Sequence, residues 1–82
     1  NAISEELMIE INVLAKESIG KIIEVGVDDK ILEKGILDSP AIINLILIIE
    51  KKYNVTIEQD EMNMDNFSSI NQIEKLIKSK IG

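Results

Sequence analysis

Apolar residues recur at helical spacing along most of the chain. In the first segment Ser4 precedes two glutamates, and a capping hydroxyl followed by acids is typical of a helix start. The apolar stripe that follows comprises Leu7, Ile11, Leu14 and Ala15, and Ile19, Ile22 and Ile23 can continue it. A first helix is therefore predicted from Ser4 to either Gly20 or Gly26, since each glycine could cap its end. Residues 1–2 stand outside this prediction.

The segment from residue 26 to 37 loses the helical pattern, and Asp28, Asp29 and Gly35 indicate turns within it. It is nevertheless too apolar to be a free linker. Its apolar residues are Val27, Ile31, Leu32, Ile36 and Leu37. We therefore expect this segment to lie across the helices, held there by some of these side chains.

A second helix is predicted to open at Asp38-Ser39-Pro40 and to end near Tyr53, because Asn54 and a run of β-branched residues follow. Serine at the N-cap with proline at the first helical position is a favoured start, since the missing N–H of proline costs nothing there. At about 100° per residue, one face of this helix forms the core side. That face comprises Ile42, Leu45, Ile46, Ile49 and Tyr53.

The C-terminal part begins with an acidic segment, residues 58–68, whose large apolar anchor is Phe67. A short third helix or turn is predicted there. Ser69 and Gln72 form a capping-box pattern, which starts a last helix. The apolar stripe of that helix comprises Ile70, Ile73, Leu76 and Ile77, with Ile81 as a further candidate. Residues 1–82 are thus predicted to form a single all-α domain, a small bundle of three long helices and one short one.

Composition narrows the chemistry that is available. The chain has no Cys and no His, which excludes thiol chemistry, zinc binding through Cys and any His-containing triad. A formal net charge of −6 argues against nucleic acid as a partner, because it repels phosphate backbones. The longest apolar run, Leu45–Ile49, is far too short to span a membrane, and no secretory signal is visible. We expect a cytoplasmic protein without membrane insertion.

The stretch around Ser39 carries a more specific pattern. The residues GILDS, 35–39, precede the apolar run from 42 to 49, and YNV, 53–55, follows it. This order resembles the phosphopantetheine-attachment region of the acyl, peptidyl and D-alanyl carrier protein family. DDKILEKGILDS, 28–39, resembles the long loop ahead of the attachment serine. DNFSSINQIEKLI, 65–77, resembles the family's Phe-bearing turn into its last helix.

The resemblance implies both a fold and a function. It implies the four-helix bundle of the acyl carrier protein type and a carrier protein rather than an enzyme. Ser39 would carry 4′-phosphopantetheine through a phosphodiester, and the thiol of that arm would hold acyl or aminoacyl groups as thioesters. A phosphate at this place is compatible with the free N–H groups of a helix N-terminus. Asp38 is either a further cap or a group that the modifying transferase reads, and both interpretations remain open.

The implied partners are a phosphopantetheinyl transferase, an acyl- or aminoacyl-activating ligase and downstream transferases, and the carrier is expected to be a monomer. A D-alanyl carrier and a carrier for an amino-acid- or fatty-acid-activating ligase, as in fatty acid or secondary-metabolite biosynthesis, are not separated by composition. An unmodified helical protein-interaction module with a carrier-like fold is the alternative function. Clustered acids at 24–38 and 58–65 could bind a divalent ion, but solvated charge is the simpler account, and no metal site is predicted.

Two features depart from the family's usual pattern. Pro40 stands where members mostly carry Leu, Val or Met, which bears on the choice of transferase more than on attachment. The outward face of the second helix comprises Pro40, Asn44, Leu47 and Lys51, with Ile48 beside them. In the family this face meets partner enzymes and is usually acidic, whereas here it is apolar and ends in lysines. Leu47 and Ile48 either pack under the 26–37 segment or form a partner surface bound through apolar contact.

Overall fold

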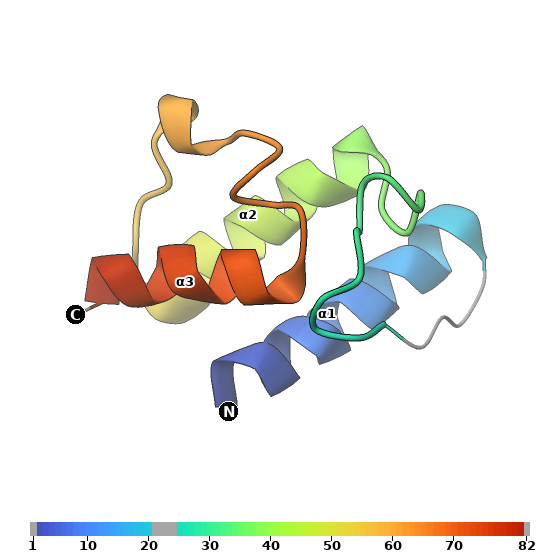
Figure 1. Cartoon of the computed structure of the whole chain (residues 1–82), viewed down its shortest axis with the longest axis horizontal. Coiled ribbons are helices and arrows are strands. Elements are labelled where there is room, and N and C mark those ends of the chain that lie inside the picture. Colours follow the sequence, from blue (N-terminus) through green and yellow to red (C-terminus); the bar gives the residue numbers. More distant parts are fainter. Residues whose placement is uncertain (1, 21–24, 82) are drawn as a thin grey trace.

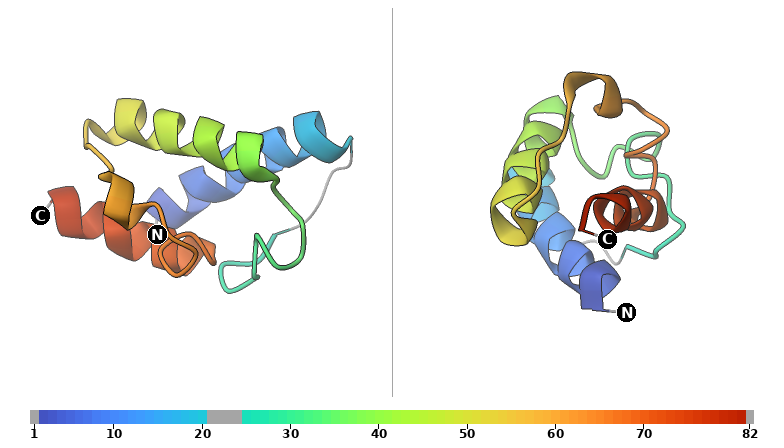
Figure 2. Two further views of the ribbon diagram at one scale, coloured as in Figure 1. Left: turned by 90° about the horizontal axis from the view of Figure 1, so that it is seen from above. Right: turned by 90° about the vertical axis from the view of Figure 1, so that its left-hand side faces the viewer.

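The computed structural model describes residues 2–20 and 25–81, and Figure 1 shows its course. Its elements are α1 (Ala2–Ile19), α2 (Ser39–Tyr53), the 3-10 turn η1 (Gln59–Glu61) and α3 (Ile70–Ile81). Within these residues there is no strand, which agrees with the predicted all-α fold. α1 packs against both α2 and α3. The connection between α1 and α2 and the one between α2 and α3 are the two long connections. Both lie on the side of the molecule that carries α3, as the two views of Figure 2 show.

The start of α1 differs from the prediction, whereas its end agrees with one of the two predicted glycines. The helix begins at Ala2, so Ser4 lies inside its first turn and is 8% exposed rather than standing as the N-cap. Ala2 and Ile3, which precede Ser4, extend the helix towards the N-terminus. Alanine is the strongest helix former, which favours this extension. At the other end, Gly20 adopts φ +71° and donates its N–H to the carbonyl of Lys16, which makes it the terminating glycine. The predicted continuation through Ile22 and Ile23 lies outside the described residues.

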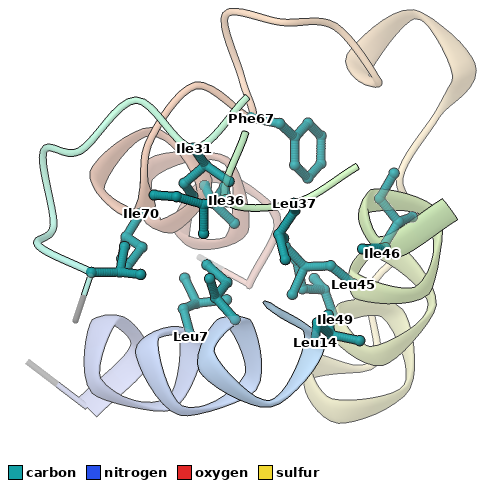
Figure 3. Packing of buried hydrophobic residues seen from close by; sticks show 14 of the residues in the cluster. Leu7, Leu14, Ile31, Ile36, Leu37, Leu45, Ile46, Ile49, Phe67 and Ile70 are labelled. Atoms are coloured by element: carbon teal, nitrogen blue, oxygen red, sulfur yellow. The ribbon is translucent and has the colours of Figure 1, made fainter. Parts of the chain in front are cut away.

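The connection between α1 and α2 lies across the bundle, as predicted. Its backbone is bonded to the segment that leads into α3, where the Ser68 carbonyl accepts the Ile31 N–H, and to the first turn of α3, where Asn71 donates its N–H to the Val27 carbonyl. Figure 3 shows its apolar side chains pointing into the core beside Phe67. Ile31, Ile36 and Leu37 are almost fully buried. The segment is thus a packed part of the fold rather than a linker.

α2 and α3 have the predicted bounds. Asn54 ends α2 in the left-handed conformation, with φ 54° and its N–H bonded to the Glu50 carbonyl. The Ser69 hydroxyl accepts the Gln72 N–H at 3.3 Å, which is the serine half of the predicted capping box. On both helices the predicted stripes face the core, except that Ile81 is 51% exposed. The buried residues of the two helices are Ala41, Leu45, Ile46, Ile49, Ile70, Ile73, Leu76 and Ile77.

The short third helix or turn predicted at residues 58–68 is a single 3-10 turn, η1. Its acidic residues cannot contribute a buried stripe, so the longer α-helices and Phe67, which is 2% exposed, close the core on this side. Tyr53, the other aromatic residue, is half-buried and donates a hydrogen bond from its hydroxyl to Glu6 on α1 at 2.5 Å. Both aromatic side chains therefore help to close the bundle, as expected.

Candidate functional site

Ser39 occupies the first position of α2, and Asp38 is its N-cap. The Asp38 backbone is extended, with φ −89° and ψ 179°, and its Oδ1 accepts the Ala41 N–H at 3.0 Å. The interpretation of Ser39 as the cap is therefore wrong by one residue, and Pro40 follows at the second helical position. The capping role that remained open for Asp38 is confirmed.

Because Asp38 satisfies the helix end, the Ser39 hydroxyl has no structural task. The residue is exposed, and its hydroxyl makes no hydrogen bond among the described residues. Its neighbours, by contrast, are firmly held, since Ile36 and Leu37 are 4% and 2% exposed. The Ser39 hydroxyl is thus free while the backbone before it is anchored in the core.

Gly35 is what allows the chain to reach Ser39 in this way. Its φ is +67°, a conformation that side-chain-bearing residues rarely adopt, and its N–H donates to the Leu32 carbonyl. The adjoining Ile36 N–H bonds back to the Ile31 carbonyl at 2.9 Å. The turn thereby reverses the chain, and the two apolar residues after it anchor the start of α2 in the core.

Pro40 and Asn44 border a hollow between the last turns of α1 and the first turns of α2. Both residues are exposed. The hollow is lined by Leu14, Glu17, Ser18, Asp38, Pro40, Ala41 and Asn44. It lies beside the backbone of Ser39 and is open to an approaching partner.

The outward face of α2 is apolar and uncovered. Pro40, Asn44, Leu47 and Lys51 are all exposed, Leu47 by 58%, whereas Ile48 is half-buried against the core. Packing under the 26–37 segment is therefore not the role of Leu47. Ile43, 59% exposed, belongs to the same face and is not among the residues predicted for it from the sequence. Its spacing could have placed it there, because it lies four residues after Ser39 and four before Leu47.

The ionisable groups whose pKa departs from its ordinary value lie in other parts of the fold. A hydrogen bond from the Gly26 N–H, then the contact with Lys34, lowers the pKa of Asp29. The Lys80 ammonium, then the Glu58 N–H, lowers the pKa of Glu61. Burial, then the bond to Glu6, raises the pKa of Tyr53. These groups bond other segments together rather than activating Ser39.

Two further classes of site find no support in the described part of the chain. No three acidic side chains there converge in a way that could hold a metal ion. None of the described helices combines the length and the apolarity that crossing a bilayer demands.

Several curated proteins resemble this chain along most of their length. A D-alanyl carrier protein of Leuconostoc citreum is 32% identical over 81 residues, covering 99% of this chain and 99% of that protein. Another, from Leuconostoc mesenteroides, is 36% identical over 64 residues, covering 78% of this chain and 82% of its own. A third, from Bacillus licheniformis, is 35% identical over 65 residues. No protein-family model matches the chain.

A solved structure shares the fold. It is a chain in the crystal structure of the Bradyrhizobium japonicum glycine:[carrier protein] ligase complexed with its cognate carrier protein and an analogue of glycyl adenylate. The TM-score is 0.85 over 98% of this chain and 100% of that one, at 22% identity. The arrangement of three helices and long connections is thus one that a known protein adopts with little sequence in common.

Proposed function

Because this chain belongs to the D-alanyl carrier protein family, we propose that it is a non-catalytic aminoacyl carrier modified on Ser39 with 4′-phosphopantetheine. The observation that supports this most is the division of roles at the start of α2. Asp38 caps the helix, and the adjacent Ser39 hydroxyl is exposed and without a hydrogen bond among the described residues. A serine kept for structural reasons alone would be expected to make that cap itself.

The residues around Ser39 fit such a group. A phosphodiester on the first residue of α2 would lie at the positive dipole end of the helix. It would gain little from the N–H groups there, because Asp38 already accepts the Ala41 N–H and Pro40 has none. The arm, when present, supplies a thiol that holds the aminoacyl group as a thioester. The protein supplies a fixed attachment point, through the buried Ile36 and Leu37, and leaves the approach to it open.

The proposed partners are a phosphopantetheinyl transferase, an ATP-dependent aminoacyl ligase and an acceptor transferase that removes the cargo. A ligase is supported by the structural neighbour, a carrier described in complex with its glycine ligase. The names of the relatives favour an amino acid over a fatty acid as cargo. Partner enzymes would bind the exposed α2 face around Leu47. We further propose that the carrier acts as a monomer and in the cytoplasm. The chain has no Cys, so nothing in it indicates an oxidising compartment in which disulfides form.

Intact mass spectrometry tests the proposal directly. The protein is incubated with coenzyme A and a broad-specificity phosphopantetheinyl transferase, alongside Ser39→Ala and, as a matched control, Ser18→Ala. Wild type and Ser18→Ala should each gain the mass of one arm, and Ser39→Ala should gain none. Circular dichroism confirms that each variant is folded. An unmodified wild type, or an arm on Ser39→Ala, would refute the assignment and favour an unmodified interaction module.

A further inference from the structure

The first turn of α2 leaves almost no backbone donor free for an added anion. The first N–H groups of an α-helix have no partner within the helix. Here Ala41 donates its N–H to the Asp38 carboxylate at 3.0 Å, and Pro40 has no N–H to donate. The Ile42 N–H is bonded to the Asp38 carbonyl, also at 3.0 Å. Within the described part of the chain, Ser39 is therefore the residue of this turn whose N–H remains without a hydrogen bond.

The charges nearest to Ser39 are negative. Asp38 precedes it directly, so their Cα atoms are about 3.8 Å apart. Glu17, in the last turns of α1, lines the hollow between α1 and α2 together with Asp38, and no lysine among the described residues lines it. Both carboxylates stand outside the ion pairs that the described residues form. An anion attached to Ser39 would therefore face two carboxylates that no cation neutralises.

We infer that Pro40 and Asp38 keep the phosphodiester of the arm off the end of α2, so that modification of Ser39 weakens the start of this helix instead of stabilising it. The inference rests on the proposed function. A phosphate in the first turn of a helix ordinarily stabilises it, through the dipole and through hydrogen bonds to free N–H groups. Here the attraction of the dipole remains. Asp38 already occupies the donor at Ala41 and adds the repulsion of a like charge, and Pro40 removes the donor next to Ser39.

The repulsion has a consequence for partner binding. Asp38, Ser39 and Glu17 are all exposed, so the effect is modest and is screened by salt. A partner that places a cation beside the phosphodiester removes the repulsion and restores the lost stability. Because coupling between two binding events is reciprocal, the same cation gives the modified carrier an advantage over the unmodified one. The start of α2 thus favours the partner-bound state of the modified form.

Urea denaturation of the unmodified and the modified protein tests the inference. Ser39 is modified with coenzyme A and a broad-specificity phosphopantetheinyl transferase, and intact mass confirms one arm per chain. In wild type, modification should lower the urea midpoint at low salt. The loss should shrink as salt rises, because the screening length falls from about 30 Å at 0.01 M to about 3 Å at 1 M. A low-salt midpoint that modification leaves unchanged or raises would overturn the inference.

Variants at the helix start separate the two causes. Pro40→Ala returns a backbone N–H to the position next to Ser39, and modification should then raise the urea midpoint. Asp38→Asn keeps an acceptor for the cap but removes the charge, and the loss on modification should shrink. Asn44→Ala, an exposed and uncharged position one turn further along α2, is the matched control and should show the wild-type loss.

Nuclear magnetic resonance supplies a readout that a purely structural role of Pro40 would not change. In modified Pro40→Ala, the backbone amide at position 40 should shift on modification, and the phosphorus relaxation should report a phosphodiester that moves with the helix. In modified wild type, the phosphorus should keep the picosecond-to-nanosecond motion of an exposed side chain. Equal phosphorus relaxation in the two proteins would overturn the role of Pro40. Failure of the proposed function is distinguished beforehand, because the mass of the protein shows whether Ser39 carries the arm at all.

Discussion

Asp38 and Ser39 are adjacent residues with different roles at the start of α2. Both residue types cap helices well, and either could have accepted the first free N–H of α2. The structure assigns that bond to Asp38. The buried Leu37 before it and Pro40 after it restrict the backbone on both sides. The serine hydroxyl remains free as a consequence.

The stability of variants should reflect this separation. Asp38→Ala removes the cap and should lower the free energy of unfolding by about 0.5–2 kcal/mol. Asp38→Asn keeps an acceptor and should stay close to wild type, and Ser39→Ala should lose no more than about 0.5 kcal/mol. Urea denaturation of the three variants measures this. A Ser39→Ala variant destabilised as much as Asp38→Ala would contradict the assignment of the cap.

Phe67 anchors the connection between α2 and α3, which has little regular structure. It is 2% exposed and lies in the core beside Ile31 and Leu37. Phe67→Ala should cost about 3–5 kcal/mol, a large part of the roughly 5–15 kcal/mol that stabilises a typical domain. Met64→Ala, three residues earlier and exposed, is the matched control and should change stability by less than about 0.5 kcal/mol. Similar melting of the two variants would indicate that the connection is not anchored.

The same connection is fastened at η1 by an ion pair that acid should break. The Lys80 Nζ and Glu61 Oε1 atoms lie 2.6 Å apart, and the pKa of Glu61 is lowered from its ordinary value of 4.5. A lowered pKa in the folded state stabilises the fold above that ordinary value, and this contribution is lost as the pH falls through the folded-state pKa.

Glu61→Gln should therefore unfold at lower urea concentration than wild type near neutral pH. The difference between the two should shrink as the pH falls well below 4.5, because wild type then loses the same interaction. Asp60→Asn, whose carboxylate forms no ion pair among the described residues, is the control and should follow the wild-type pH profile. A gap between Glu61→Gln and wild type that is constant with pH would exclude this role of the pair.

The elements that could be predicted from sequence are those with a strong local signal. The bounds of α2 and α3 follow from Pro40, Asn54 and Ser69, and the burial of the 26–37 segment follows from its apolar residues. The choice between adjacent caps could not be predicted, because it depends on which residue the packed loop leaves in the extended conformation. The bond from Tyr53 to Glu6 joins residues far apart in the chain and has no local signal.

At the scale of the whole molecule, the apolar outward face of α2 is set within an acidic protein. The net charge is −6, yet this face presents Ile43 and Leu47, each more than half exposed, and ends at two lysines. Each exposed aliphatic forgoes up to about 1.5–3 kcal/mol of burial free energy in the free protein. A partner that covers the face recovers part of it. We therefore expect the proposed ligase partner to bind this face mainly through apolar contact.

Salt dependence distinguishes apolar docking from docking by charge. The screening length falls from about 10 Å at 0.1 M to about 3 Å at 1 M salt, whereas apolar contact is preserved or strengthened by excluded salts. The apparent affinity of the cognate ligase for the carrier should thus change little across a salt series. Leu47→Glu should weaken binding more than Lys51→Glu, because it places a charge in a desolvated contact. Val13→Glu, an exposed apolar site on α1, is the matched control and should bind like wild type. A steep loss of affinity with salt, or unimpaired binding of Leu47→Glu, would instead assign the contact to the acidic segments at 24–38 or 58–65.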